Sequence, residues 1–169
     1  MNFIFDRASV REFSDMELNV PVVENLIKAG MQAPSAKNSQ PWEFIVVTDE
    51  EDFEAVSKMS PFAKPAANAK KLIITLANLD VLKESDTEEW FQQSLAACNE
   101  NILLEAVKEG VGAVWLGFYP NQERIDALRD YFEIPDSVVP FSVIALGYPK
   151  EKPVARKNYK AEKIHVGKY

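Results

Sequence analysis

Short, continuous apolar runs alternate along this chain with longer stretches in which apolar residues recur at every third or fourth position. The continuous runs are typical of strands that are buried on both faces, and the wider spacing is typical of amphipathic helices. The first pattern predicts strands at residues 42–48, 72–77, 111–119 and 138–147. Strands that are interleaved with helices in this way indicate a layered α/β or α+β domain.

A short helical turn is expected at 3–7. The helical pattern then predicts helices at 20–32 and 87–109, one helix that ends at Met59 and another that ends at Phe132. Two capping boxes are predicted, in which a hydroxyl residue is followed three positions later by a glutamate. They are Thr48 with Glu51, before the helix that ends at Met59, and Ser85 with Glu88, before the helix 87–109. Pro120 or Asn121 is expected to begin the last helix, and Gly110 is a typical helix terminator.

The predicted helix 87–109 carries apolar residues around almost its whole circumference. A helix with this pattern is buried on more than one side. In a chain of this size, the second covering surface could belong to another subunit.

Polar residues and prolines are concentrated between the helix 20–32 and the first strand, in the segment Ala33-Pro34-Ser35-Ala36-Lys37-Asn38-Ser39-Gln40-Pro41-Trp42. Prolines fix φ and push the residues before them toward extended conformations, so this loop is expected to be stiff. A stiff polar loop that joins a helix to a core strand is suited to holding a ligand. Pattern alone leaves open the simpler interpretation, a connection built from turn-forming residues.

Composition limits the possible classes of protein. The 169 residues are enough for one domain, 1–169, with its own core. The single cysteine, Cys98, excludes an internal disulfide, and there is no apolar run of membrane-spanning length. The first residues do not resemble a signal peptide, so a cytoplasmic location is expected, without membrane partners. The net charge of −7 argues against broad nucleic-acid binding.

The charge is unevenly distributed, because seven basic and two acidic residues lie in the last 21 positions, 149–169. This C-terminal arm therefore carries +5 and the other 148 residues carry −12. Such an arm is compatible with a solvated tail, a partner-binding arm or part of an anion site.

A second concentration of positive charge is the segment Arg7-Ala8-Ser9-Val10-Arg11. If the segment is extended, Arg7, Ser9 and Arg11 share one face. If it is helical, the two arginines still share a face, because they are four positions apart. Two guanidinium groups and a hydroxyl can then converge on one anion, and the planar fork of arginine suits a phosphate well. A pair of surface arginines that neutralises nearby acids is the simpler alternative.

The sequence lacks the residues that several common kinds of catalysis need. There is no glycine-rich nucleotide loop, and the one histidine, His165, lies in the arm. A metal cluster or a Ser/His/Asp triad is therefore not expected. Cys98 lies among leucines and alanines and is interpreted as a small buried apolar residue rather than as a nucleophile. If the protein is an enzyme, a bound cofactor has to supply the reaction.

Four motifs, taken in order, resemble the nitroreductase family of flavoproteins over essentially the whole chain. They are Arg7-x-Ser9-x-Arg11-x-Phe13, Ala33-Pro34-Ser35-Ala36-x-Asn38-x-Gln40-Pro41-Trp42, Gly110-Val111-Gly112-x-Val114-Trp115-Leu116-Gly117 and Leu146-Gly147-Tyr148-Pro149. The second motif is fairly specific, and the others gain weight from their order. The resemblance implies an α+β fold of three layers, with a central, mostly antiparallel sheet flanked by helices. It also implies an intertwined homodimer with FMN in two clefts at the interface.

Matched position by position, Arg7, Ser9 and Arg11, with Ala8 between them, correspond to residues that hold the flavin phosphate and ribityl chain. The loop residues that would come from the partner subunit are Pro34, Ser35, Ala36 and Asn38. The backbone of Leu116 and Gly117 corresponds to the segment beside the flavin ring near N5. The family commonly adds a basic residue from the C-terminal tail, where this chain has Asn158 at the matching position, and Arg156 is the residue chosen for that contact.

The activity implied by the resemblance is a ping-pong transfer of hydride from NAD(P)H, through flavin N5, to a nitroaromatic, a quinone or another flat acceptor. A flavin-binding module with little turnover, used for redox sensing or partner docking, is the alternative from another class. A third possibility is a branch that fragments flavin or removes halogen from aromatic rings.

Overall fold

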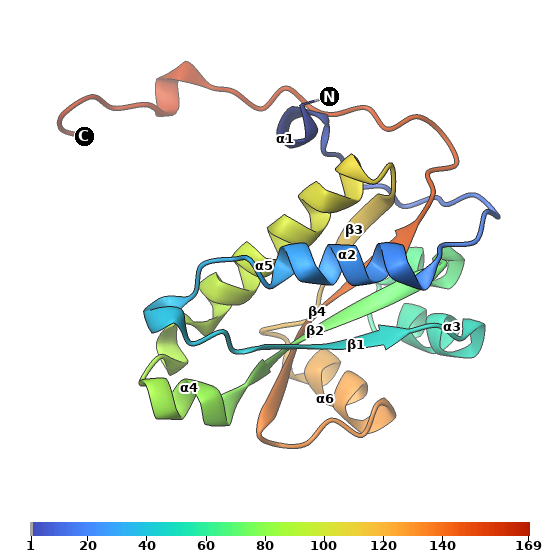
Figure 1. Ribbon diagram of the computed structural model, residues 1–169, viewed down its shortest axis with the longest axis horizontal. Coiled ribbons are helices and arrows are strands. Elements are labelled where there is room, and N and C mark those ends of the chain that lie inside the picture. The colour runs from blue at the N-terminus through green and yellow to red at the C-terminus, as the bar shows by residue number, and fades with distance from the viewer. Residues whose placement is uncertain (1) are drawn as a thin grey trace.

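The computed structural model describes residues 2–169, which form a four-stranded sheet with helices on both faces (Figure 1). The strands are β1 (Trp42–Val47), β2 (Lys71–Asn78), β3 (Gly112–Gly117) and β4 (Val138–Gly147). They lie in the order β1-β2-β4-β3, and each neighbouring pair is antiparallel. The four predicted strands are confirmed, and β1 and β3 are the edges of the sheet.

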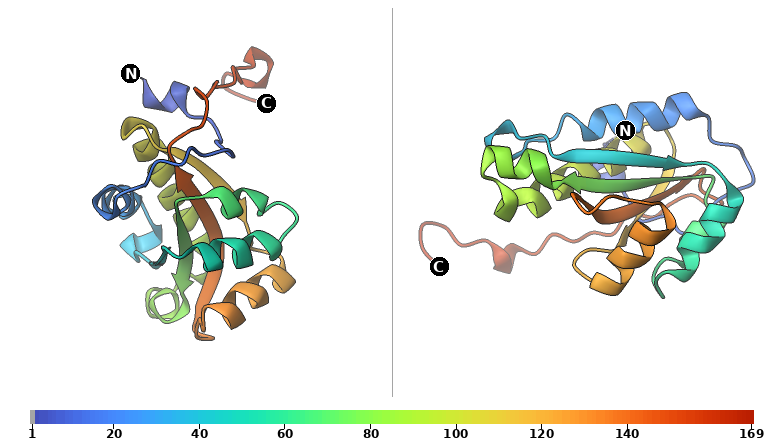
Figure 2. Two further views of the ribbon diagram at one scale, coloured as in Figure 1. Left: turned by 90° about the vertical axis from the view of Figure 1, so that its right-hand side faces the viewer. Right: turned by 90° about the horizontal axis from the view of Figure 1, so that it is seen from below.

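The helices form two layers around the sheet (Figure 2). The α-helices are α1 (Phe3–Asp6), α2 (Val20–Gly30), α3 (Glu50–Lys58), α4 (Leu79–Ser85), α5 (Phe91–Lys108) and α6 (Gln122–Tyr131). The 3₁₀ turns are η1 (Ala36–Asn38), η2 (Lys64–Asn68), η3 (Glu88–Trp90) and η4 (Ala161–Lys163). One apolar cluster packs α2, α4 and α5 on one face, and a second packs α3, η2 and α6 on the other. The expected three-layer α+β fold is confirmed.

Two predicted helix starts are wrong. Asp49, not Thr48, is the N-cap of α3, and the Thr48 hydroxyl donates to the Asp49 carboxylate at 3.2 Å. The strand β1 extends to Val47, so Thr48 belongs to the connection and the helix begins one residue later than the capping box requires.

The second capping box fails because the sequence contains a helix that the pattern did not reveal, α4. Asn78 caps it, accepting hydrogen bonds from the N–H groups of Asp80 at 2.9 Å and Val81 at 3.2 Å. Ser85 lies in its last turn, where the hydroxyl donates to the Val81 carbonyl at 2.8 Å. The long helix α5 therefore begins at Phe91, after η3, and not near residue 87. Asn78 is both the end of β2 and the cap of α4, so no separate turn marks the boundary.

The end of α5 agrees with the prediction for Gly110. This glycine has a φ of +73°. The N–H of Val111 donates to the Ala106 carbonyl at 2.7 Å, and the N–H of Gly110 donates to the Val107 carbonyl at 3.1 Å. This is the double hydrogen-bond pattern that closes a helix around a left-handed residue.

The apolar circumference of α5 is covered largely by its own chain. Leu95, Cys98 and Ile102 are completely buried, and α2 packs closely on the helix because Gly30 has no side chain. A Cβ at Gly30 would lie 2.8 Å from Ile102 and 3.0 Å from Cys98. A second subunit is therefore not needed to cover most of this helix, and Trp90, just before it, stays half-exposed.

Candidate functional site

The N-terminal segment forms a short addition to the open edge of β3. After α1 ends, Ser9 makes a parallel bridge to Ala113, and the N–H of Val10 donates to the Ala113 carbonyl at 3.0 Å. Val10 packs where Gly112 has no side chain, since a Cβ there would lie 2.8 Å from Val10. The segment is extended, which is the first of the two conformations considered from the sequence, and it lies beside the first residues of β3.

Both ends of the chain meet at a cavity of about 570 Å³ beside this segment. It is lined by Ile4, Phe5, Arg7, Ala8, Ser9, Arg11, Val154, Arg156, Asn158 and Tyr159, and we call it the arginine cavity. The arm runs past α1 and then away from the body, so it carries Arg156 to the N-terminal residues (Figure 1). Five of the sequence-predicted site residues are thus brought together from opposite ends of the chain.

Two of the arginines in the cavity have no carboxylate partner in the described part of the chain. Arg7 pairs with Glu100 of α5, with 3.6 Å between the guanidinium Nε and a carboxylate oxygen. Arg11 donates to the Ser9 carbonyl at 3.4 Å, and no ion pair within residues 2–169 involves Arg11 or Arg156. In a protein of net charge −7, guanidinium groups that are left without acids are available to an external anion.

From the arginine cavity, the edge of β3 leads to a second polar position. The Ala113 carbonyl faces away from β4, since it accepts from Val10, and the Gly117 carbonyl accepts from Arg124 Nη1 at 3.1 Å. Backbone groups of alternate residues point the same way in an antiparallel strand, so the N–H groups of Trp115 and Gly117 also face the open edge. Ala113 and Gly117 are about 13 Å apart along the strand. The side chain of Leu116, in contrast, is buried in the core.

The surface above Gly117 is open. This glycine does not have a positive φ, and a Cβ built on it would meet nothing within 4 Å. Neither its own conformation nor packing within the chain therefore requires a glycine here. A missing side chain at such a position allows another flat group to approach the backbone closely.

The loop that contains Pro34, Ser35, Ala36 and Asn38 lies apart from the arginine cavity, and none of these residues lines it. The loop is fixed at the start of α5, where the Ala36 N–H donates to the Ser94 hydroxyl at 3.4 Å. In this loop, three residues other than glycine have left-handed φ angles. They are Lys37 (φ 50°), Asn38 (φ 55°) and Gln40 (φ 49°). Strained backbone of this kind is concentrated at functional sites.

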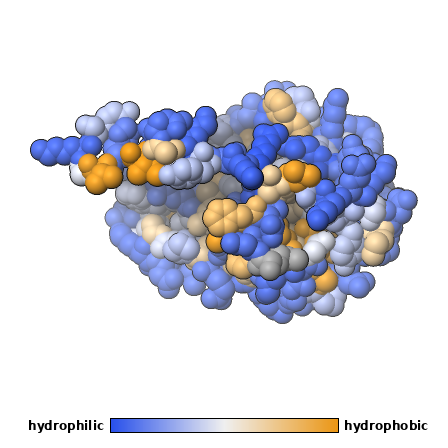
Figure 3. Space-filling model, turned by 90° about the horizontal axis from the view of Figure 1, so that it is seen from above, coloured by the Kyte–Doolittle hydropathy of each residue, from blue (hydrophilic) through white to orange (hydrophobic). Residues whose placement is uncertain are grey.

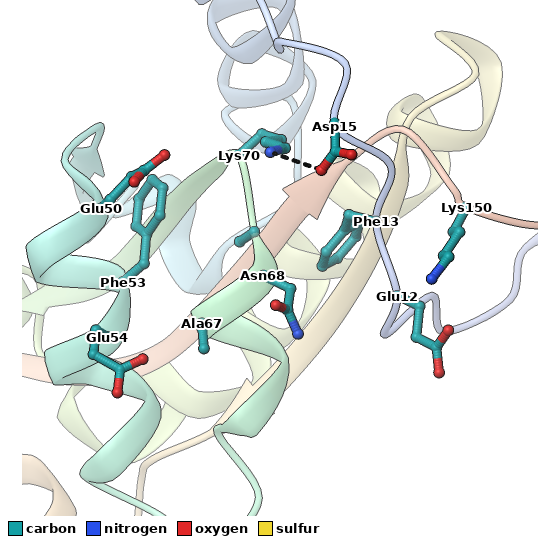
Figure 4. A pocket seen from close by; sticks show the side chains of 11 residues that line it. Glu12, Phe13, Asp15, Glu50, Phe53, Glu54, Ala67, Asn68, Lys70 and Lys150 are labelled. Carbon is teal, nitrogen blue, oxygen red and sulfur yellow. Dashed lines mark ion pairs between the residues drawn. The ribbon is translucent and has the colours of Figure 1, made fainter.

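A larger cavity, about 720 Å³, lies elsewhere, between the N-terminal segment, α3 and η2 (Figure 4). Its two lysines are Lys70 and Lys150, and Lys70 pairs with Asp15 at 3.9 Å. Four carboxylates line the same cavity: Glu12, Asp15, Glu50 and Glu54. Because acids outnumber lysines there, this cavity is a poor anion site, and the arginine cavity is the better candidate.

Other chemistry is limited by burial and by the residues present. Burial raises the pKa of the Cys98 thiol to about 12, which agrees with its interpretation as an apolar core residue. Within residues 2–169, no group of three or more histidines, cysteines and acids is arranged to hold a metal. No helix in the described part of the chain combines the length and apolarity needed to cross a membrane.

Sequence reasoning missed Arg124 and Phe62. Arg124 lies in the first turn of α6, and its guanidinium carbon is 5.4 Å from the centre of the Phe62 ring. The predicted cap Asn121 is confirmed, because its side chain accepts from the Arg124 N–H at 3.1 Å. Asn121 is a local signal for the start of the helix, but nothing in the sequence shows that Arg124 contacts both Phe62 and Gly117.

The fold is thus of the α+β class, with an antiparallel four-stranded sheet flanked by helices and the arginine cavity near the N-terminal end of the edge strand β3. The model of the nitroreductase family matches residues 4–71 and 62–148, so this chain belongs to the nitroreductase family. The resemblance inferred from the four sequence motifs is confirmed.

Individual relatives agree with the family assignment. A candidate NADH dehydrogenase/NAD(P)H nitroreductase of Archaeoglobus fulgidus is 40% identical over 172 residues, which cover 100% of this chain and 98% of the relative. A candidate NADH oxidase from Clostridium acetobutylicum has a crystal structure with a TM-score of 0.93 at 39% identity, covering 99% of both chains. A candidate nitroreductase in complex with FMN from Desulfovibrio desulfuricans has a TM-score of 0.82 at 25% identity, covering 99% of this chain and 95% of the other.

Proposed function

We propose that this protein is an FMN-dependent oxidoreductase that reduces nitroaromatics, quinones or similar flat acceptors at the expense of NAD(P)H. The observation that carries this proposal is the arginine cavity. It collects Arg7, Ser9 and Arg11 from the start of the chain and Arg156 from the arm, and it adjoins the open edge of β3. Family membership favours an enzyme over a flavin-binding module with little turnover.

The residues present fit FMN. Arg11 and Arg156, which form no ion pair with any described residue, would hold the phosphate dianion, and Ser9 would donate to it or to the ribityl chain. The Gly117 N–H, on the open edge, would donate to the flavin ring, and no side chain there would obstruct it. When bound, FMN would supply the two-electron hydride chemistry that this chain's side chains lack.

The chain's own contribution is to position flat groups and to leave one face open to them. With the flavin ring against the Gly117 backbone, the outer face of that ring would stay open, so a nicotinamide and an aromatic acceptor can use that face in turn. Occupation in turn leads to ping-pong kinetics. No second nucleotide-binding motif is needed for this scheme.

We also propose that the site is shared between two copies of the chain. The loop of Pro34, Ser35, Ala36 and Asn38 is strained but lies away from the arginine cavity of its own chain. The arm stands out from the body (Figure 3) and exposes apolar side chains, with Tyr159 80%, Val166 93% and Val154 85% accessible. Such an arm needs a surface to cover, and a second copy that also offers its loop would satisfy both requirements.

The spectrum of the purified protein tests the cofactor assignment. We expect a yellow protein with about one FMN per chain, and much weaker binding of riboflavin, which has the ring but not the phosphate. NADH consumption with menadione or 4-nitrobenzamide, at several fixed acceptor concentrations, should give parallel double-reciprocal lines. A protein that binds FMN but consumes NADH only at a trace rate would support the non-enzymatic alternative instead.

A mixing experiment tests the shared site. Asn38→Ala and Arg11→Ala homodimers would each have two defective sites. A mixed dimer would have one intact site and one doubly defective site, so refolding the two variants together should restore part of the FMN affinity. If mixing restores nothing while both variants fold and dimerise, Asn38 does not serve the partner's site.

A further inference from the structure

One arginine that forms no ion pair with a described carboxylate lies outside the arginine cavity. Of the five arginines, Arg7 and Arg129 pair with carboxylates. Within residues 2–169, no ion pair involves Arg11, Arg124 or Arg156. Arg11 and Arg156 line the arginine cavity, but Arg124 does not. Although the chain has 26 acids, the guanidinium of Arg124 is left free for a different anion.

The Arg124 side chain is nevertheless held in place. Its Nη1 donates to the Gly117 carbonyl at 3.1 Å, and its guanidinium lies over Phe62 at 5.4 Å from the ring centre. A guanidinium has five N–H donors, and within residues 2–169 this single bond is the one its side chain makes. A preorganised cation with unused donors loses little entropy when it binds an anion.

Phe62 and Gly117 surround this cation with flat, accessible surface. Phe62 is 71% exposed, which is unusual for a large aromatic residue. The space above Gly117 is open, as described above. We call Phe62, Gly117 and Arg124 together the Gly117 shelf. It combines an aromatic face, a cation and a bare strand edge.

The Gly117 shelf is separate from the site for the cofactor's phosphate. Ser9, in the arginine cavity, pairs with Ala113, which is four residues, or about 13 Å, from Gly117 along β3. One phosphate therefore cannot reach both Arg11 and Arg124 unless the two side chains turn toward each other, and Arg124 is fixed by Gly117. A second anion has to be carried by another molecule.

We propose that the Gly117 shelf binds the anionic group of the reacting partner, with Arg124 holding the anion and Phe62 lying against a flat ring next to it. This inference rests on the proposed function and names a substrate property within it. The same chemistry, an anion beside a planar ring, is found in an aryl carboxylate acceptor and in NAD(P)H, with its phosphates and adenine. The test separates these two sources.

The experiment uses the FMN-loaded protein and two acceptors of the same shape, 4-nitrobenzoate and the neutral 4-nitrobenzamide. Arg124→Gln removes the charge, Arg124→Lys keeps the charge without the planar fork, and Lys58→Gln on α3 is the matched charge control. Lys58 pairs with Glu54 at 2.9 Å and belongs to neither site. If the anion is the acceptor's, Arg124→Gln raises KM about tenfold or more for the benzoate and less than twofold for the amide. Arg124→Lys should recover part of the loss.

If the anion belongs to NAD(P)H, Arg124→Gln instead raises the KM for the dinucleotide, equally with either acceptor. Calorimetric titration of 4-nitrobenzoate into the oxidised holoprotein gives a readout without turnover and should show the same loss of affinity in the first case. Unchanged KM values for all three compounds, with Lys58→Gln and Arg124→Gln alike, overturn the proposal. So does a tenfold loss of FMN affinity in Arg124→Gln, which would assign the guanidinium to the cofactor.

These outcomes are distinct from failure of the proposed function. A wild-type protein that neither binds FMN nor oxidises NAD(P)H refutes the proposed function and the Gly117 shelf together. A wild-type protein that does both, with variants that behave like it, refutes only the shelf.

Discussion

The two ends of strand β3 both carry glycine, and the chain treats them in opposite ways. At Gly112, Val10 and the Gly147 carbonyl fill the space next to the backbone, at 2.8 Å and 3.0 Å from where a Cβ would be. At Gly117, nothing lies within 4 Å of the same atom. The first glycine serves packing within the chain, and the second leaves space that the chain itself does not use.

The difference assigns a structural role to the Gly112 end and a ligand-binding role to the Gly117 end. The Gly112 end seats the N-terminal segment and so fixes the side of the arginine cavity that holds Ser9 and Arg11. The Gly117 end presents open backbone, the exposed ring of Phe62 and the guanidinium of Arg124, which forms no ion pair among the described residues. Changes at the first end should act on folding and cofactor binding, and changes at the second should act on ligands while leaving folding intact.

The largest effect is expected for Arg11→Ala. A charge-assisted hydrogen bond to phosphate contributes roughly 1.5–3 kcal/mol, so FMN affinity should fall about ten- to a hundredfold. Fluorescence quenching of FMN measures it. Lys37→Ala is the control, because Lys37 is also a cation in a proposed site loop, but it pairs with Asp86 at 3.1 Å and lies outside the arginine cavity. Equal, small effects would mean that Arg11 is an ordinary surface residue.

Gly112→Ala should mainly lower stability. The added methyl would overlap Val10 and approach backbone, so we expect the free energy of unfolding to fall by about 2 kcal/mol. Denaturant unfolding of the FMN-free protein measures this loss, and FMN affinity should fall with it as the N-terminal segment moves. A variant as stable as the wild type would show that the segment is not held against β3 in solution.

Gly117→Ala should give the reverse result. The methyl meets nothing in the chain, so the free energy of unfolding of the FMN-free protein should change by less than about 1 kcal/mol. FMN affinity or the KM for a flat acceptor should nevertheless worsen severalfold. If stability falls as far as in Gly112→Ala, the contrast between the two ends is wrong.

The smallest effect concerns Cys98, which lies in the buried middle of α5 and reports whether either glycine variant disturbs the core. The thiolate is the reactive form, and burial raises the pKa of this thiol to about 12. At pH 8, therefore, we expect essentially no reaction with a disulfide reagent in the native protein and complete reaction after unfolding. Rapid reaction in the native Gly112→Ala variant would indicate opening of the core rather than a local shift.

Local patterns predicted most of the fold, and they failed where two signals fell on the same residue. The four strands and the end of α5 at Gly110 followed from continuous apolar runs and from a glycine in the usual position. The helix α4 was missed because Asn78 ends β2 and caps the helix at once. The capping box at Thr48 failed because β1 runs up to Val47, and the one at Ser85 failed because Ser85 lies in the last turn of α4.

The candidate site was predicted only in part. Arg7, Ser9, Arg11 and Arg156 were chosen from motifs and charge, and the structure brings them to one cavity. Their roles toward FMN stay predictions. The sequence offered no route to Arg124 and Phe62, because their association depends on how α6 and the segment before η2 reach the same end of β3.

The sequence by itself determined the family, the set of strands and the presence of two cationic segments, because these depend on residue identity and on short-range spacing. The tertiary structure decided which cations remain without acids, which glycine is packed and which is open, and that the loop at Asn38 is kept from the cavity of its own chain. These features arise from contacts between residues far apart in the chain. Spacing along the chain does not encode such contacts, and only the packing of helices on the sheet fixes them.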